Sequence, residues 1–294
     1  MQNNFLYSRR ELLKKSAVLT GLAALGLLSL DMIAPEIKEK YKIGACDWSL
    51  GKQNEVEALA LAKKIGLDGV MVSLGSVANN MHLRQKEVQK TYLRAAKKFG
   101  MKISSLAIGE LNKVPYKSEP ETEEWVSDSI DVAEAMGCKV ILLAFFNKGD
   151  LRGDEAGIRE VIRRLKKVAP KAEKAGVILG IESWLNADEH LRIIHAIGSK
   201  NVRVYYDVSN SHNMGYDIYK EMSRLSKEYI CEVHAKENGC LLGQGKIDFE
   251  KVKKVLDDIG YEGWIIMEGA VPPGANLFDS YVANNKYIRS VFNP

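Results

Sequence analysis

Eight short apolar runs, whose starts lie 25 to 37 residues apart, constrain the fold of this 294-residue chain more than any other feature. They are rich in Val and Ile and lack strict alternation with polar residues, as is typical of strands buried on both faces. Each interval has the length of one βαβ unit, which needs roughly 30 residues. The runs are Ile43–Trp48, Val70–Leu74, Ile103–Ile108, Val140–Phe146, Val177–Glu182, Val202–Asp207, Ile230–His234 and Trp264–Glu268.

Helical patterns fill the intervals between the runs. The first interval has an apolar stripe at helical spacing, made of Val56, Leu59, Ala62 and Ile65 and followed by Gly66. Glycine suits the left-handed residue that ends a helix, and five more stand at matching places: Gly100, Gly137, Gly176, Gly198 and Gly260. Eight βα units in a chain of this size predict an α/β fold, a closed (β/α)8 or TIM barrel, as a single domain over residues 37–294.

Two residues of cap-forming type mark expected helix starts. Asn54 and Asp248 each precede a helical pattern, and Asn and Asp side chains accept hydrogen bonds from the free N–H groups of a helix N-terminus. We therefore expect both to be N-caps.

The first 36 residues are interpreted as an export signal and linker. Residues 8–14 spell S-R-R-E-L-L-K, and an apolar run follows from Ala17 to Leu30. A charged region before so short an apolar stretch is typical of an export signal, and the paired arginines resemble the twin-arginine signal of bacteria. We expect a bacterial protein that is exported to the periplasm. An amphipathic or single-span N-terminal anchor is the alternative.

Charge and cysteine content exclude several classes of protein. The chain has 42 Lys and Arg against 38 Asp and Glu, a net charge of +4. A nucleic-acid-binding protein usually has a strongly basic domain or stripe, so this balance argues against that class. The four cysteines include no CxxC, which argues against a zinc finger or disulfide scaffold and favours buried free thiols: Cys46, Cys138, Cys231 and Cys240. We expect no membrane span beyond the N-terminal segment. A homo-oligomer is compatible with the sequence.

Four chemistry-bearing residues end the last four apolar runs. They are Glu182, Asp207, His234 and Glu268, spaced by 25, 27 and 34 residues. Catalytic groups of such barrels lie at the carboxyl ends of the strands, where a carboxylate is costly unless it is paired, protonated or bound to a cation. Taken alone, a strand-end Glu is more often ion-paired and a single His is as often a core residue, but four on adjacent strands favour a joint site. Three carboxylates and an imidazole suit one divalent ion, Mn²⁺, Mg²⁺ or Co²⁺, and Zn²⁺ is compatible.

The strand-end motifs G-I-E-S-W, Y-Y-D-V-S-N, V-H-A-K-E-N and I-I-M-E-G resemble those of the xylose isomerase-like barrel superfamily. It includes sugar phosphate isomerases and epimerases, ketose 3-epimerases, hydroxypyruvate isomerase, inosose dehydratase and endonuclease IV. The resemblance covers about Lys42 to Pro294. It implies that the four strand-end residues are the metal ligands and that Glu182 and Glu268 are the catalytic acid–base pair.

The chain departs from the ketose 3-epimerases at substrate-contacting positions. Where that group has His three residues after the metal Asp, this sequence has Asn210, and His212 follows two residues later. Where it has Glu six residues after the strand-five Glu, this sequence has Asp188. Lys236 is expected to hold a substrate oxygen, with an ion pair to a carboxylate as the alternative. Trp48 is expected to form an apolar wall for a sugar ring, with core packing as the alternative.

Other polar and aromatic residues carry weaker expectations. Glu110, after the third run, and Asn186 are minor substrate-binding candidates. The helix expected after the fifth run carries His190 and His195, which we expect at the surface. Tyr205 and Tyr206 are expected in the core.

A site of this kind predicts chemistry at a carbon next to a ketone. A divalent ion acts there as a Lewis acid and stabilises the enediolate formed when a carboxylate removes the neighbouring proton. Reprotonation on the other face is epimerisation, and proton delivery to the neighbouring carbon is isomerisation. We expect a divalent-metal-dependent isomerase or epimerase whose partner is a small sugar or polyol ketone. A lyase acting on 3-keto-glycosides or inososes by β-elimination is the alternative.

Two further classes fit less well or stay open. The abasic-site endonuclease of the superfamily needs several metals, and hence more ligands than five His and a nearly neutral chain suggest. A non-catalytic sugar-binding barrel that keeps the metal for its shape stays open.

Overall fold

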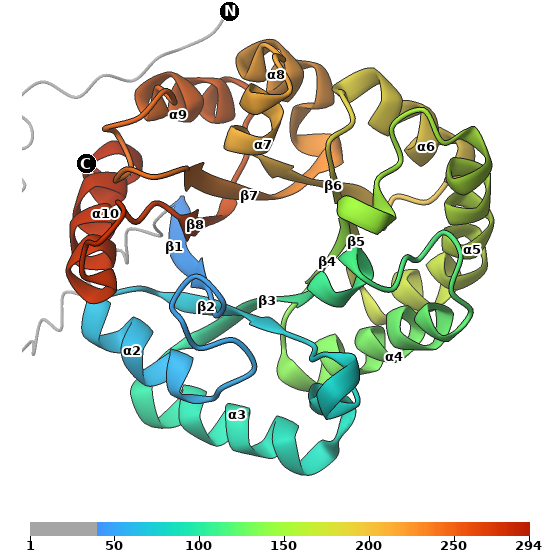
Figure 1. Ribbon diagram of the computed structural model, residues 1–294, viewed down its shortest axis with the longest axis horizontal. Helices are drawn as coiled ribbons and strands as arrows, with labels where there is room; N and C mark the ends of the chain where they lie inside the picture. The colour runs from blue at the N-terminus through green and yellow to red at the C-terminus, as the bar shows by residue number, and fades with distance from the viewer. Residues whose placement is uncertain (1–39) are drawn as a thin grey trace, which may run out of the picture. The chain divides into compact units, whose positions relative to one another are not determined.

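Residues 40–294, which the computed structural model describes, form a closed barrel of eight parallel strands (Figure 1). The strands pair in chain order, and β8 pairs with β1 to close the barrel. They are β1 (Tyr41–Cys46), β2 (Gly69–Ser73), β3 (Lys102–Ile108), β4 (Val140–Phe145), β5 (Ile178–Ser183), β6 (Val202–Asp207), β7 (Ile230–Glu237) and β8 (Gly263–Gly269). The predicted (β/α)8 barrel is confirmed. The predicted export signal lies outside the described residues and stays a prediction.

Helices surround the barrel on its outer side (Figure 1). They are α2 (Glu57–Ile65), α3 (Lys86–Phe99), α4 (Glu121–Met136), α5 (Glu155–Ala175), α6 (Ala187–Ile197), α7 (Val208–Asn213), α8 (Ile218–Tyr229), α9 (Phe249–Asp258) and α10 (Leu277–Phe292). Short 3-10 turns follow β2, β3 and β4: η1 (Val77–Asn79), η2 (His82–Arg84), η3 (Gly109–Asn112) and η4 (Asn147–Gly149). Within residues 40–294, no helix has both the length and the apolar character to span a membrane.

Most of the predicted helix boundaries are correct. Five of the six glycines are left-handed C-caps, and the sixth, Gly260, follows α9 with a φ of 70°. Asp248 caps α9 by accepting a hydrogen bond from the Lys251 N–H. The N-cap predicted at Asn54 is wrong, because Val56 precedes α2. Asn54 instead has a φ of 63°, and its N–H donates to Asp47 Oδ2.

Two glycines make room for an aromatic ring in the barrel wall. Gly44 of β1 pairs in register with Gly69 of β2, and the Trp264 side chain of β8 reaches across both. A Cβ at Gly69 would lie 2.6 Å from Trp264 Cη2 and 2.7 Å from the Lys102 carbonyl oxygen. Because protein interiors are close-packed, neither contact can be relieved without moving the ring or a backbone.

A buried histidine ties α6 to the end of β5, so the predicted surface position of His190 is wrong. His190 is 3% exposed, and its Nδ1 donates to the Asn186 carbonyl oxygen over 3.0 Å. Its Nε2 therefore accepts from the Ser183 hydroxyl at 2.9 Å. Burial lowers the pKa of His190 to about 4. The imidazole can be buried because both nitrogens are satisfied, whereas His195 is exposed, as predicted.

We predict that Gly69→Ala lowers the free energy of unfolding by about 2 kcal/mol, because overpacking a filled interior forces side chains or backbone to shift. Urea unfolding measures the change. The matched control is Gly109→Ala, where a Cβ meets nothing within 4 Å. Equal stability of the two variants would contradict the close approach at Gly69.

A second prediction concerns acid stability. The pKa of His190 is lower in the folded chain, about 4, than its ordinary value of 6.5, so the unfolded chain binds this proton first. The neutral His190 side chain therefore contributes to the free energy of unfolding above pH 6.5, and this contribution is lost as the pH falls toward 4. Relative to His190→Gln, the wild-type protein should lose about 3 kcal/mol of unfolding free energy between pH 7 and pH 4. A constant difference across that range, in urea titrations, would show that His190 titrates normally.

Candidate metal centre

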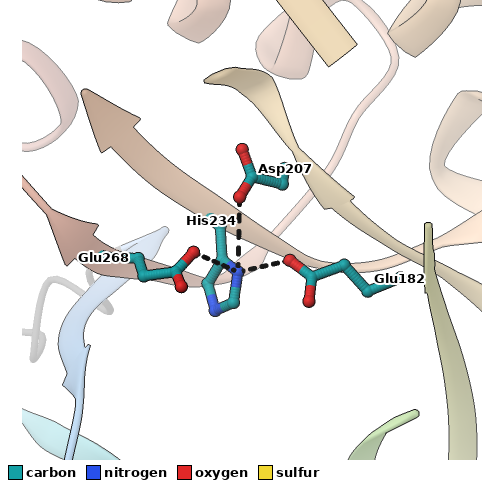
Figure 2. Close-up of side chains that lie close together, drawn as sticks. All are labelled: Glu182, Asp207, His234 and Glu268. Carbon is teal, nitrogen blue, oxygen red and sulfur yellow. Dashed lines mark hydrogen bonds and ion pairs between the residues drawn. The ribbon is translucent and has the colours of Figure 1, made fainter. Parts of the chain in front are cut away.

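Four side chains from four successive strands converge at the mouth of the barrel (Figure 2). They are Glu182 of β5, Asp207 of β6, His234 of β7 and Glu268 of β8, and one possible ligand atom of each lies within 4.8 Å of the others. His234 Nδ1 is 2.7 Å from Glu182 Oε1, 3.4 Å from Glu268 Oε2 and 3.9 Å from Asp207 Oδ2. The residues that the sequence predicted as metal ligands therefore share one centre.

Strand register and local hydrogen bonds aim these groups. Parallel pairing places Asp207 beside His234, and Lys236 beside Glu268. Asp207 Oδ1 accepts hydrogen bonds of 2.8 Å from two backbone N–H groups at the start of α7, those of Ser209 and Asn210. One oxygen of Asp207 is thus held by the helix, and the other faces the centre.

The free oxygens at the centre fit a cation. Asp207 Oδ2 and Glu268 Oε2 are buried, and apart from their ion pairs with Lys236 and His234 they have no partner in the described part of the chain. Buried polar atoms are normally paired, so such atoms point to a missing ligand. Three carboxylates and one imidazole are a donor set for a divalent ion. The residues present therefore fit the predicted metal.

The carboxylates dominate the electrostatics of the centre. Burial alone would lower the pKa of His234, but the nearby Glu182, Glu268 and Asp207 raise it to about 9. Burial raises the pKa of Asp207. For Glu268, burial is outweighed by His234 and Lys236, which keep its pKa low. Because a metal binds the neutral imidazole, cation binding at this centre would release protons.

Lys236 is a fixed positive charge beside the centre. Its Nζ lies 3.0 Å from Glu268 Oε2 and 3.4 Å from Asp207 Oδ2. Burial opposes its charge, but these carboxylates raise the pKa of Lys236. The ion pair named as the alternative for Lys236 is therefore present, and Lys236 also lines the cavity above the centre.

A cavity of about 500 Å³ opens above the centre. Its lining includes Trp48, Asn210 and Lys236, which the sequence predicted as substrate-binding residues, and the minor candidate Glu110. Trp48 Nε1 also donates to Glu268 Oε1 over 3.1 Å, so the indole orients this carboxylate besides forming a wall.

Two predicted substrate ligands lie elsewhere. Asp188 is exposed on α6, where it pairs with Arg224 at 2.9 Å, and it is not among the residues that line the cavity. His212 lines a separate hollow of about 230 Å³. The minor candidate Asn186 is the N-cap of α6. Residue spacing from a strand end did not predict where these side chains lie, because successive residues of an α-helix point in different directions around its axis.

The sequence analysis missed several residues of the cavity. Phe146 and Trp184, which follow β4 and β5, form an aromatic wall with ring centroids 5.1 Å apart. Asn112 and Asn147 add amide groups from the turns after β3 and β4. Their position in the sequence could have predicted them, because all four closely follow a strand and the βα loops of a barrel form its active site.

The core predictions are confirmed, whereas the prediction of four buried thiols holds only for Cys46 and Cys138, because Cys231 and Cys240 are partly exposed. Tyr205 and Tyr206 are buried, and the Tyr205 ring packs 4.5 Å from that of His234. All four cysteines are free thiols. Cys46 is fully buried beneath the centre, and burial raises the pKa of its thiol well above the usual range.

Comparisons with known proteins agree with the fold. A D-psicose 3-epimerase of Enterocloster bolteae is 28% identical over 145 residues, 45% of this chain and 46% of that protein. The chain thus matches less than half the length of this curated relative. An inosose dehydratase of Clostridium perfringens is 25% identical over 83% of this chain and 92% of that protein.

Solved structures share the architecture. The D-psicose 3-epimerase of Clostridium cellulolyticum H10, solved with D-tagatose, superposes with a TM-score of 0.73 at 17% identity, covering 86% of this chain and all of that one. The family described as "Xylose isomerase-like TIM barrel" matches residues 59–289. The chain belongs to this xylose isomerase-like TIM barrel family.

Proposed function

We propose that this protein is a divalent-metal-dependent epimerase or isomerase of a small sugar or polyol ketone, acting at a carbon next to the carbonyl. The observation that carries the proposal is the convergence of three carboxylates and one imidazole at the floor of a cavity of about 500 Å³. The D-psicose 3-epimerase among its relatives supports the same chemistry.

Two glutamates are placed for proton transfer. Glu182 and Glu268 approach His234 from opposite sides (Figure 2). A ketone substrate held between them presents one face of its reactive carbon to each carboxylate. One carboxylate removes the proton, and the other returns a proton to the opposite face, which inverts the carbon. Trp48 and Lys236 hold Glu268 ionised and oriented, so we assign the first proton abstraction to Glu268.

The negative charge of the enediolate needs compensation. Lys236 Nζ faces the cavity and provides a fixed positive charge near the developing oxyanion. Glu182, Asp207, His234 and Glu268 would hold the divalent ion, whose Lewis acidity would polarise the carbonyl group. The aromatic walls, Trp48 on one side and Phe146 with Trp184 on another, limit the access of water.

A lyase is the second candidate. The inosose dehydratase match extends over far more of both chains than the D-psicose 3-epimerase match does. The same first proton abstraction from an inosose or a 3-keto-glycoside leads to elimination when the electron pair expels a substituent from the β-carbon. The second carboxylate then protonates the departing oxygen. Export to the periplasm, which residues 8–30 suggest, would give either enzyme substrates outside the cytoplasm.

Removal of divalent ions should abolish turnover. We predict that chelator-dialysed protein is inactive, and that Mn²⁺ restores activity and raises the thermal midpoint, because binding at about 1,000 times Kd adds about 4 kcal/mol of stability. Activity on D-psicose, an inosose and a 3-keto-glucoside is followed by product analysis, in which a dehydrated product or a released aglycone identifies a lyase. Full turnover by verified metal-free protein would refute the metal-dependent mechanism.

Separate variants of the two glutamates test the acid–base pair. We expect Glu182→Gln and Glu268→Gln each to lower turnover by about 10³-fold, because an amide cannot transfer the proton. In deuterated water, Glu182→Gln should still exchange the substrate proton, while Glu268→Gln should not, as measured by NMR at matched metal occupancy. The control is Glu87→Gln, an exposed carboxyl on α3. Exchange that survives only in Glu268→Gln would reverse the assigned roles.

A further inference from the structure

The far side of the His234 ring has its own hydrogen-bond partner. Nδ1 faces the three carboxylates, and Nε2 lies 3.4 Å from Cys46 Sγ. Both side chains are fully buried, with exposed fractions of 0%. Among residues 40–294, Cys46 is the group within hydrogen-bond distance of Nε2. The contact joins β1 to β7 across the barrel interior.

The two ends of the imidazole are chemically linked. An imidazole that offers the Nδ1 lone pair to a cation carries its proton on Nε2. That N–H needs an acceptor, because a buried donor without one costs about 1–3 kcal/mol. Cys46 Sγ is within reach of it. Independently, the carboxylate oxygens of Glu182, Asp207 and Glu268 that converge on the Nδ1 side form a donor set for a divalent ion.

We propose that Cys46 is a positioning residue for the metal centre: its sulfur accepts the Nε2–H of His234 and holds the ring in the tautomer and orientation that direct Nδ1 at the cation. The inference rests on the metal-dependent function proposed above. Outer partners of metal-bound histidines are commonly carboxylates or backbone carbonyls.

The choice of a thiol has a physical reason. A carboxylate beneath His234 would add a fourth negative charge to a centre that already holds three, in a place without water to screen it. A thiol sulfur is a weak acceptor, but it carries no charge and packs like a small apolar group. Aromatic rings complete the support of His234, since Tyr205 and Trp48 pack against it with centroid distances of 4.5 and 6.2 Å.

The test measures Mn²⁺ affinity of the full chain after chelator dialysis. We expect Cys46→Ala to weaken binding about tenfold, at the low end of the effect of losing an outer partner. Cys46→Ser keeps an uncharged acceptor and should stay within about threefold of wild type. Cys231→Ala is the matched control, because this half-buried thiol also lies in the barrel wall but bonds to the Val204 carbonyl oxygen. It should bind Mn²⁺ like wild type.

A spectroscopic readout separates positioning from stability. In the Co²⁺-substituted protein, the visible absorption bands should shift in Cys46→Ala and return toward wild type in Cys46→Ser. Cys231→Ala should lower the thermal midpoint without changing the bands. The inference would be overturned if Cys46→Ala kept the Mn²⁺ affinity and absorption bands of wild type, or if Cys231→Ala lost as much Mn²⁺ affinity as Cys46→Ala. Either result would leave the proposed function standing. If the wild-type protein binds no Mn²⁺, the proposed function falls, and the inference falls with it.

Discussion

Mutual repulsion between three carboxylates at the barrel mouth is the constraint around which the site is organised. Two like charges about 4 Å apart cost several kcal/mol in a partly buried environment, and here the charges of Glu182, Asp207 and Glu268 converge on one imidazole. Glu182 contacts His234 Nδ1, and the other two carboxylates receive further compensation. Asp207 accepts two backbone N–H groups, Glu268 accepts the Trp48 indole N–H, and Lys236 faces both. A divalent cation at the centre would supply the charge that these contacts leave unbalanced.

The closed barrel holds these carboxylates together against their mutual repulsion. Its strands are held on both sides by parallel pairing from β1 through β8, so no strand can retreat to relieve the repulsion. The interior is packed closely enough that Gly44 and Gly69 leave room for one indole ring and no more. Contacts such as His190 with Ser183 then fix the strand ends that carry the ligands.

The two halves of the barrel have different tasks. Strands β5 to β8 carry every member of the carboxylate and imidazole cluster. The loops after β1, β3 and β4 provide further walls of the cavity, among them Trp48, Asn112 and Phe146. Under the proposed function, proton abstraction depends on groups of β5 to β8, and residues of both halves line the cavity.

The amino-acid sequence by itself determined the barrel and its four strand-end ligands. Both depend on local order: strands buried on two faces read as apolar runs, and each ligand directly follows its own run. Tertiary structure alone decided the rest. Asp188 lies outside the cavity and Asn54 in a left-handed turn because helix direction and loop hydrogen bonds set their positions. The contact of Cys46 with His234 joins residues 188 positions apart, and no periodicity within one strand or helix reports a contact made across a closed barrel.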